Sequence, residues 1–179
     1  MPSIFAPTGT ALLLAVALLC ACAPSLDWRD VRPADSPVQL LMPCKPIVQE
    51  RGVVLAGQPV RLVLHACSAG GQTWALAMAD VNDPARVGAA LAALRAAAAA
   101  NIGAAASGPG PTPLRVPGAT PNPGSQRLRL QGKLPDGKAV QTQLVVFTHG
   151  TRVFQATAVG EQVPDEAAQT FFDAIRVQP

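Results

Sequence analysis

Stretches rich in apolar and β-branched residues, bounded by short turn signals, recur along the chain. Two such stretches, Ile47–Leu55 and Gln58–Cys67, are separated by Ala56-Gly57, a pair typical of a tight two-residue turn. They predict an antiparallel hairpin. Further apolar-rich stretches over Val38–Met42 and Gln72–Asp80 predict one strand before this hairpin in the sequence and one after it.

Three more strands are predicted after residue 125. The pairs Asp136-Gly137 and His149-Gly150 are typical of tight turns. They divide the segment into Gln126–Leu134, Lys138–Thr148 and Thr151–Val159. Short turns between successive strands predict a meander, in which each strand pairs with the next.

Two segments have the spacing of amphipathic helices instead. Asp83 and Pro84 suit the first residues of one helix, which is rich in alanine and ends before Gly103. The second covers Pro164–Val177 and places Phe171 on its apolar face. The order of these elements predicts an α+β fold, an antiparallel sheet with two helices packed on it.

This order, together with three short stretches, resembles the PsbP-like family, which includes periplasmic lipoproteins of the DcrB type. The stretches are Pro43–Pro46 after the first strand, Asp83-Pro84 at the first helix, and Phe171–Val177 near the end of the chain. The resemblance covers about residues 38–177 and implies an α/β/α sandwich. It also implies a binding or accessory role, because the better-known members of the family are not enzymes.

The beginning of the chain has the features of a targeting segment. An uncharged apolar run, Ala11–Leu19, is too short for a bilayer-spanning helix, which needs about 20 residues. Small residues follow it, as in a secretory signal peptide, which we predict over residues 1–21. The alternative is an uncleaved inner-membrane anchor formed by residues 8–22.

The end of the apolar run, Leu19-Cys20-Ala21-Cys22, resembles the lipobox of bacterial lipoproteins. The resemblance implies cleavage before Cys22 and attachment of lipid to its thiol, so that Cys20 leaves with the signal peptide. Because Ala23 and not Asp follows, it also implies sorting to the outer membrane, with the protein facing the periplasm. Residues 22–36 are then expected to form a lipidated polar tether.

Two cysteines, Cys44 and Cys67, remain in the mature chain. In the predicted hairpin, paired residue numbers sum to about 113, so Cys67 lies opposite residue 46, close to Cys44. An even number of thiols in an oxidising compartment is expected to pair. We therefore predict a Cys44–Cys67 disulfide; the alternative, a redox-active pair, lacks the usual C-x-x-C spacing.

We expect residues 37–179 to form a single domain with a long loop at residues 103–125. The loop is crowded with Pro, Gly, Ser and Thr, which oppose regular structure. Its most apolar and basic part is the surface that we propose for partner binding: Leu114, Arg115, Val116 and Pro117.

Few residues could carry catalysis or bind a metal. The chain has two histidines, and neither lies at metal-ligand spacing from another ligand, so no metal or cofactor is expected. A hydrolase that uses His65 with Asp80 is the enzymatic alternative. The net charge of +3 comes from 14 basic and 11 acidic residues that are interleaved, so no nucleic-acid partner is expected.

Together these features predict a monomeric, non-enzymatic, lipid-anchored protein of the cell envelope. We expect it to act as a binding or accessory module for another envelope component. The alternative function is that of a periplasmic carrier of a small apolar ligand. Such a ligand would lie between the sheet and the first helix, where alanine side chains leave room.

Overall fold

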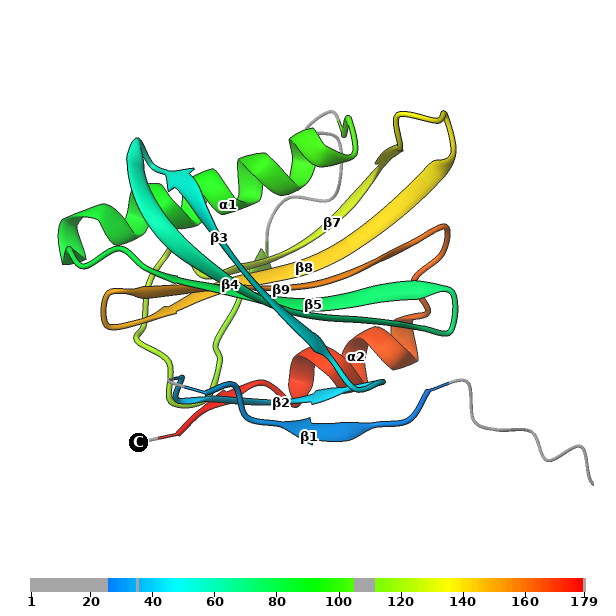
Figure 1. Ribbon diagram of the computed structural model, residues 1–179, viewed down its shortest axis with the longest axis horizontal. Helices are drawn as coiled ribbons and strands as arrows, with labels where there is room; N and C mark the ends of the chain where they lie inside the picture. Colours follow the sequence, from blue (N-terminus) through cyan, green and yellow to red (C-terminus); the bar gives the residue numbers. More distant parts are fainter. Residues whose placement is uncertain (1–25, 35, 105–111, 179) are drawn as a thin grey trace, which may run out of the picture.

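A seven-stranded antiparallel sheet forms the centre of the protein in the computed structural model, which describes residues 26–34, 36–104 and 112–178 (Figure 1). Its strands lie in the order β3-β4-β5-β9-β8-β7-β6. Their bounds are Ile47–Leu55 for β3, Gln58–Ala69 for β4, Gln72–Asp80 for β5, Thr112–Pro113 for β6, Gln126–Lys133 for β7, Ala139–His149 for β8 and Arg152–Gly160 for β9. Strand β3 lies at one edge of this sheet.

The predicted hairpin and meander are both confirmed. In the β3–β4 pair, Ile47 lies opposite Ala66 and Leu55 lies opposite Gln58. The turn residues Ala56 and Gly57 have φ angles of 49° and 76°, and two positive φ angles are typical of a type I′ hairpin turn. Strands β7, β8 and β9 pair in succession, as the two turn signals predict.

A smaller sheet and two helices complete the described part of the chain. Strand β2 (Val38–Met42) lies between β1 (Arg29–Val31) and β10 (Arg176–Val177). The helices are α1 (Val87–Asn101), preceded by the 3-10 turn Pro84–Arg86, and the shorter α2 (Asp165–Asp173). Figure 1 shows α1 on one side of the large sheet, and α2 with the small sheet on the other.

The predicted fold class is wrong, because this is a mostly-β protein and not an α/β/α sandwich with two helices. Of the described residues, 48% are in strands and 19% are helical, and only α1 is long. The second helix was expected to continue to Val177 but ends at Asp173. Arg176 and Val177 instead pair with β2, so that a small sheet shares this layer with α2.

Helix α1 covers one face of the large sheet. Leu91 and Leu94 of the helix are buried against Leu144 and Val146 of β8. The alanines around them are small and allow the helix to lie close to the strands. The predicted start is confirmed in part: the Asp83 side chain accepts a hydrogen bond from the Ala85 amide at 2.9 Å, but the first turn is a 3-10 turn.

The opposite face of the large sheet carries the aromatic core. Trp74 is fully buried there, with its ring centroid 5.2 Å from that of Phe171 in α2 and 6.0 Å from that of Trp28. On the neighbouring strands, the rings of Phe147 and Phe154 stack at 4.9 Å. Aromatic pairs at these separations add to the stability that burial alone provides.

The expected boundary between tether and domain, at residue 37, is too late. Residues 29–31 form β1, which pairs with β2, and the Asp27 amide donates a hydrogen bond to the Pro43 carbonyl at 2.9 Å. Trp28 and Leu26 pack against the aromatic core. The folded part of the chain therefore includes much of the segment that was expected to be a tether.

Candidate functional site

A groove of about 560 Å³ lies on the side of the large sheet that faces the small sheet. Residues of β3, β4 and β5 line it, together with the connection from β1 to β2 and Arg152 at the start of β9. Strand β3 contributes no buried residue to the aromatic core, so the second layer leaves this corner of the sheet open. The size is that of a typical small-ligand site.

Strand alternation gives the groove its apolar part. Side chains two residues apart lie on the same side of a strand, and residues paired across strands share that side. On β4, Val63 and His65 face the groove, and their partners on β3 are Glu50 and Val48. Met78 lies opposite Val63 on β5. Val31, Val48, Val63 and Met78 form the apolar part of the lining, on which a ligand could rest.

The charged groups of the groove are arranged as ion pairs. Arg61 Nε lies 2.9 Å from Glu50 Oε2, and Arg152 Nε lies 3.6 Å from Asp80 Oδ2. Arg32 Nε lies 3.4 Å from Asp30 Oδ1. Because each of these guanidinium groups has a carboxylate partner, the groove combines apolar walls with polar groups of nearly balanced charge.

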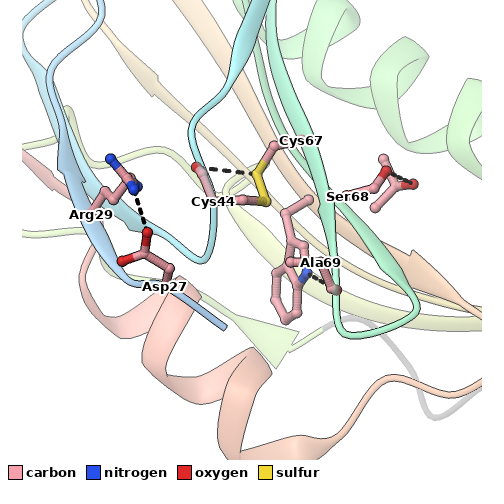
Figure 2. Close-up of a disulfide and its surroundings, with 8 residues drawn as sticks. Asp27, Arg29, Cys44, Cys67, Ser68 and Ala69 are labelled. Atoms are coloured by element: carbon pink, nitrogen blue, oxygen red, sulfur yellow. Dashed lines mark hydrogen bonds and ion pairs between the residues drawn. A yellow bond between two sulfur atoms is a disulfide. The ribbon is translucent and has the colours of Figure 1, made fainter. Parts of the chain in front are cut away.

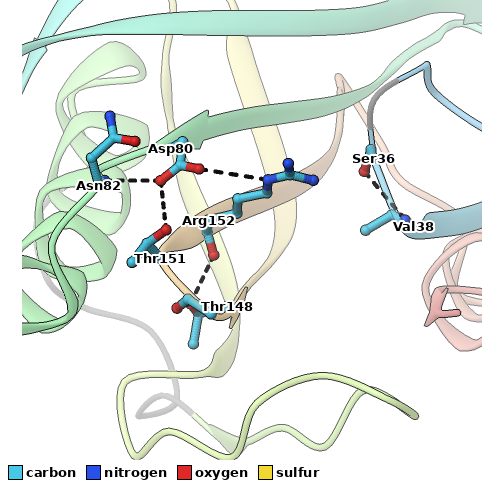
Figure 3. Close-up of polar contacts among 8 residues, drawn as sticks. Ser36, Val38, Asp80, Asn82, Thr148, Thr151 and Arg152 are labelled. Carbon is cyan, nitrogen blue, oxygen red and sulfur yellow. Dashed lines mark hydrogen bonds and ion pairs between the residues drawn. The ribbon is translucent and has the colours of Figure 1, made fainter. Parts of the chain in front are cut away.

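Asp80 is held as a carboxylate by several donors at once (Figure 3). Burial alone would raise the pKa of Asp80, but the other interactions outweigh it and leave this pKa below its ordinary value. Thr151 Oγ1 donates to Asp80 Oδ1 at 2.7 Å and the Asn82 amide donates at 2.8 Å, while Arg152 adds its charge. A carboxylate stabilised in this way is a poor proton donor or acceptor near neutral pH.

His65 and Asp80 both line the groove, but they do not form a pair. His65 lies opposite Leu76 on β5, and Asp80 follows Leu76 by four residues on the same strand. Four residues of a strand span about 13 Å, far beyond a hydrogen bond. This geometry gives no support to the hydrolase hypothesis, because a base and the group that orients it must be in contact.

His65 itself is buried, with 7% of its surface exposed, and burial lowers its pKa below the ordinary value. The folded protein therefore disfavours the protonated form, while the unfolded chain takes up the proton near pH 6.5. His65 is thus a neutral polar group in the floor of the groove at neutral pH.

Lowering the pH below about 6.5 is expected to destabilise the protein through His65, because the unfolded chain binds this proton more tightly. For one group, the free energy of unfolding can fall by no more than about 1.4 kcal/mol per pH unit. The fall stops below the pKa that His65 has in the folded protein. Chemical unfolding between about pH 7 and pH 5 measures it. The His65→Gln variant should show a flatter dependence on pH; an identical slope in both proteins would contradict this prediction.

The predicted disulfide is confirmed, with the Cα atoms of Cys44 and Cys67 5.9 Å apart (Figure 2). Cys67 lies opposite Trp74 on β5, and Cys44 follows β2. The bond therefore joins the end of the small sheet's central strand to the large sheet. Cys22, the predicted lipidation site, lies outside the described residues.

The predicted partner-binding residues lie in a segment that runs along the body of the protein. Leu114 and Val116 are half-buried and pack against the aromatic core, whereas Arg115 and Pro117 are exposed. The Pro117 carbonyl accepts a hydrogen bond from the Val177 amide at 2.8 Å. The side chains of Leu114 and Val116 are therefore directed to the core and not to a partner.

The carrier hypothesis places its ligand between the sheet and α1. The residues between α1 and the sheet are closely packed and buried, so the groove lies away from the helix where the carrier hypothesis placed it. Within the described ranges, no helix is long and apolar enough to cross a membrane. The same ranges contain no group of three or more His, Cys, Asp or Glu side chains able to hold a metal ion.

Sequence reasoning missed most of the groove, including Val48, Val63 and Met78. The only local signal for the groove is the alternation along β3, β4 and β5, which marks one side of each strand without saying what covers it.

The fold and groove define a mostly-β domain with a ligand-sized site. No protein-family model matches the chain, and a search of curated proteins gives no match either.

Proposed function

We propose that this protein is a non-enzymatic binding module of the bacterial cell envelope, and that it binds another envelope component in the groove. The observation that carries the proposal is the groove itself, with apolar walls and paired charges. Such a lining suits a molecule with an apolar body and a few polar groups. This is the ligand class of the carrier hypothesis, at a different place in the fold.

The proposed location rests on the first residues of the chain. A signal peptide over residues 1–21 exports the protein, and lipid on Cys22 holds it at the outer membrane, facing the periplasm; the alternative is an inner-membrane anchor over residues 8–22. The Cys44–Cys67 disulfide supports an oxidising compartment. Intact-mass measurement of the mature protein tests the location, because it gives both the cleavage site and the mass added to Cys22.

Binding in the groove can be tested with an amphipathic dye, 8-anilinonaphthalene-1-sulfonate. The test uses the chain from residue 22 onward, with Cys22→Ser to prevent lipidation. We expect saturable fluorescence with the native domain, and at least about tenfold weaker binding in Val63→Glu, because a charge then occupies the apolar wall.

Val54→Glu is the matched control for this experiment. Val54 is 75% exposed and does not line the groove, so the same substitution there should leave dye binding unchanged. Circular dichroism checks that both variants are folded. Equal dye binding by Val63→Glu and the wild type, with both folded, would overturn the groove as the binding site.

A further inference from the structure

The described part of the chain begins a few residues after the predicted lipid anchor. Leu26 packs against the core and lies against Gly70, where an added Cβ would be 3.0 Å from Leu26 Cδ2. Leu26 lies four positions after Cys22 in the sequence, and four residue steps span at most about 14 Å even when fully extended. A lipid on Cys22 would therefore hold this end of the body against the bilayer.

This end of the protein is built from chain segments that are far apart in sequence. The Asp27 amide is hydrogen-bonded to the Pro43 carbonyl at 2.9 Å, which places the start of β1 beside the connection from β2 to β3. Leu26 lies against the β4–β5 turn at Gly70. Figure 2 shows Asp27 and Cys44 close together at this end. The first residues of β3 follow directly from there.

Exposed apolar and basic side chains occur together at this end. Ile47 is 62% exposed on the outermost strand of the sheet, and the exposed Lys45 precedes it, whereas the neighbouring Val48 lines the groove. The nearby carboxylate of Asp27 is paired with Arg29. Apolar side chains flanked by a cation are suited to a membrane interface, where the apolar groups enter the headgroup region and the ammonium group contacts phosphates.

We propose that Lys45 and Ile47 form a membrane-contacting end, which lies on the surface of the bilayer that holds the lipid. Ile47 enters the headgroup region from the edge of β3, and Lys45 binds anionic headgroups. The occupant of this surface is thus the bilayer and not a second protein. The inference rests on the proposed lipidation of Cys22, since the short connection from Cys22 to Leu26 brings this end to the membrane.

Hydrogen–deuterium exchange of the full mature chain tests this inference. The protein as isolated from membranes is compared in detergent and in vesicles of phosphatidylethanolamine with phosphatidylglycerol. We expect the amides of residues 45 and 47–49 to exchange at least about tenfold more slowly in the vesicles, because the bilayer excludes water from the edge of β3. The far end of the same strand, residues 53–55, should not change.

Three variants sharpen the test. The variant Ile47→Ser should lose the protection in vesicles, whereas Val54→Ser, a matched change at the other end of β3, should keep it. Replacing phosphatidylglycerol by phosphatidylcholine should weaken the protection in the wild type about fivefold, and Lys45→Gln should remove that dependence on lipid charge.

Other outcomes would contradict the inference in distinguishable ways. An intact mass that shows lipid on Cys22, with no protection of residues 45–49 in vesicles, overturns the membrane-contacting end and leaves the proposed function standing. An unmodified Cys22 overturns the proposed anchor and this inference with it. Protection that is already present in detergent, together with a dimeric mass, assigns the surface to a second copy of the chain.

Discussion

Replacing Trp74 by alanine is expected to lower the free energy of unfolding by about 3–5 kcal/mol. The side chain is fully buried, and its ring contacts Phe171 of α2 on one side and Trp28 on the other. The variant therefore loses contacts in both parts of the second layer and leaves a large cavity. Because domains of this size are stable by about 5–15 kcal/mol, the variant should be close to its unfolding threshold.

Unfolding in urea, followed by circular dichroism, measures this effect. Trp28→Ala is the natural comparison: Trp28 is only half-buried, so a smaller loss is expected. Trp74→Phe should lie between the wild type and Trp74→Ala, because it keeps an aromatic ring. A loss below about 1 kcal/mol for Trp74→Ala would mean that this side chain does not hold the layers together.

Removing the disulfide through Cys44→Ala with Cys67→Ala is expected to cost about 3 kcal/mol. The bond closes a loop with a sequence separation of 23 residues, and the unfolded chain without it has more conformations available. The loss should be seen as a shift of the urea midpoint. The same shift should appear when the wild type is treated with a reducing agent.

The double variant also provides the control for the reduction experiment. It has no disulfide, so the reducing agent should leave its urea midpoint unchanged. If the wild type unfolds at the same urea concentration with and without reductant, the bond does not contribute to stability. Thiol titration of the denatured wild type confirms that the bond was present at the start.

Sequence reasoning succeeded where a local signal determines the structure. The Ala56-Gly57 turn sets the register of β3 and β4, and this register brings Cys67 close to Cys44. Asp83 is an N-terminal cap because its side chain bonds the amide two residues later, a contact that depends only on neighbours in the chain. Such features can be derived without knowledge of the rest of the fold.

Sequence reasoning failed where the conformation of one segment depends on its pairing with a distant segment. Strands β1 and β10 have three and two residues, too few for a period to be recognised, and both exist because β2 pairs with them. The end of α2 follows from the same pairing, since Ile175 and Val177 fit an extended chain as well as a helix. The groove depends on where this second layer stops, so its residues could not be identified from strand patterns alone.

The position of the disulfide also has a mechanical consequence. A pull applied to the chain at Leu26 first acts on β1, which is held by a ladder of three residue pairs to β2. If these strands peel away, the tension reaches Cys44, where the covalent bond to Cys67 transfers it to the large sheet. Extension would then stop at residue 44, so stretching of the anchored end removes the wall of the groove that the β1–β2 connection forms but leaves the walls on β3, β4 and β5 in place.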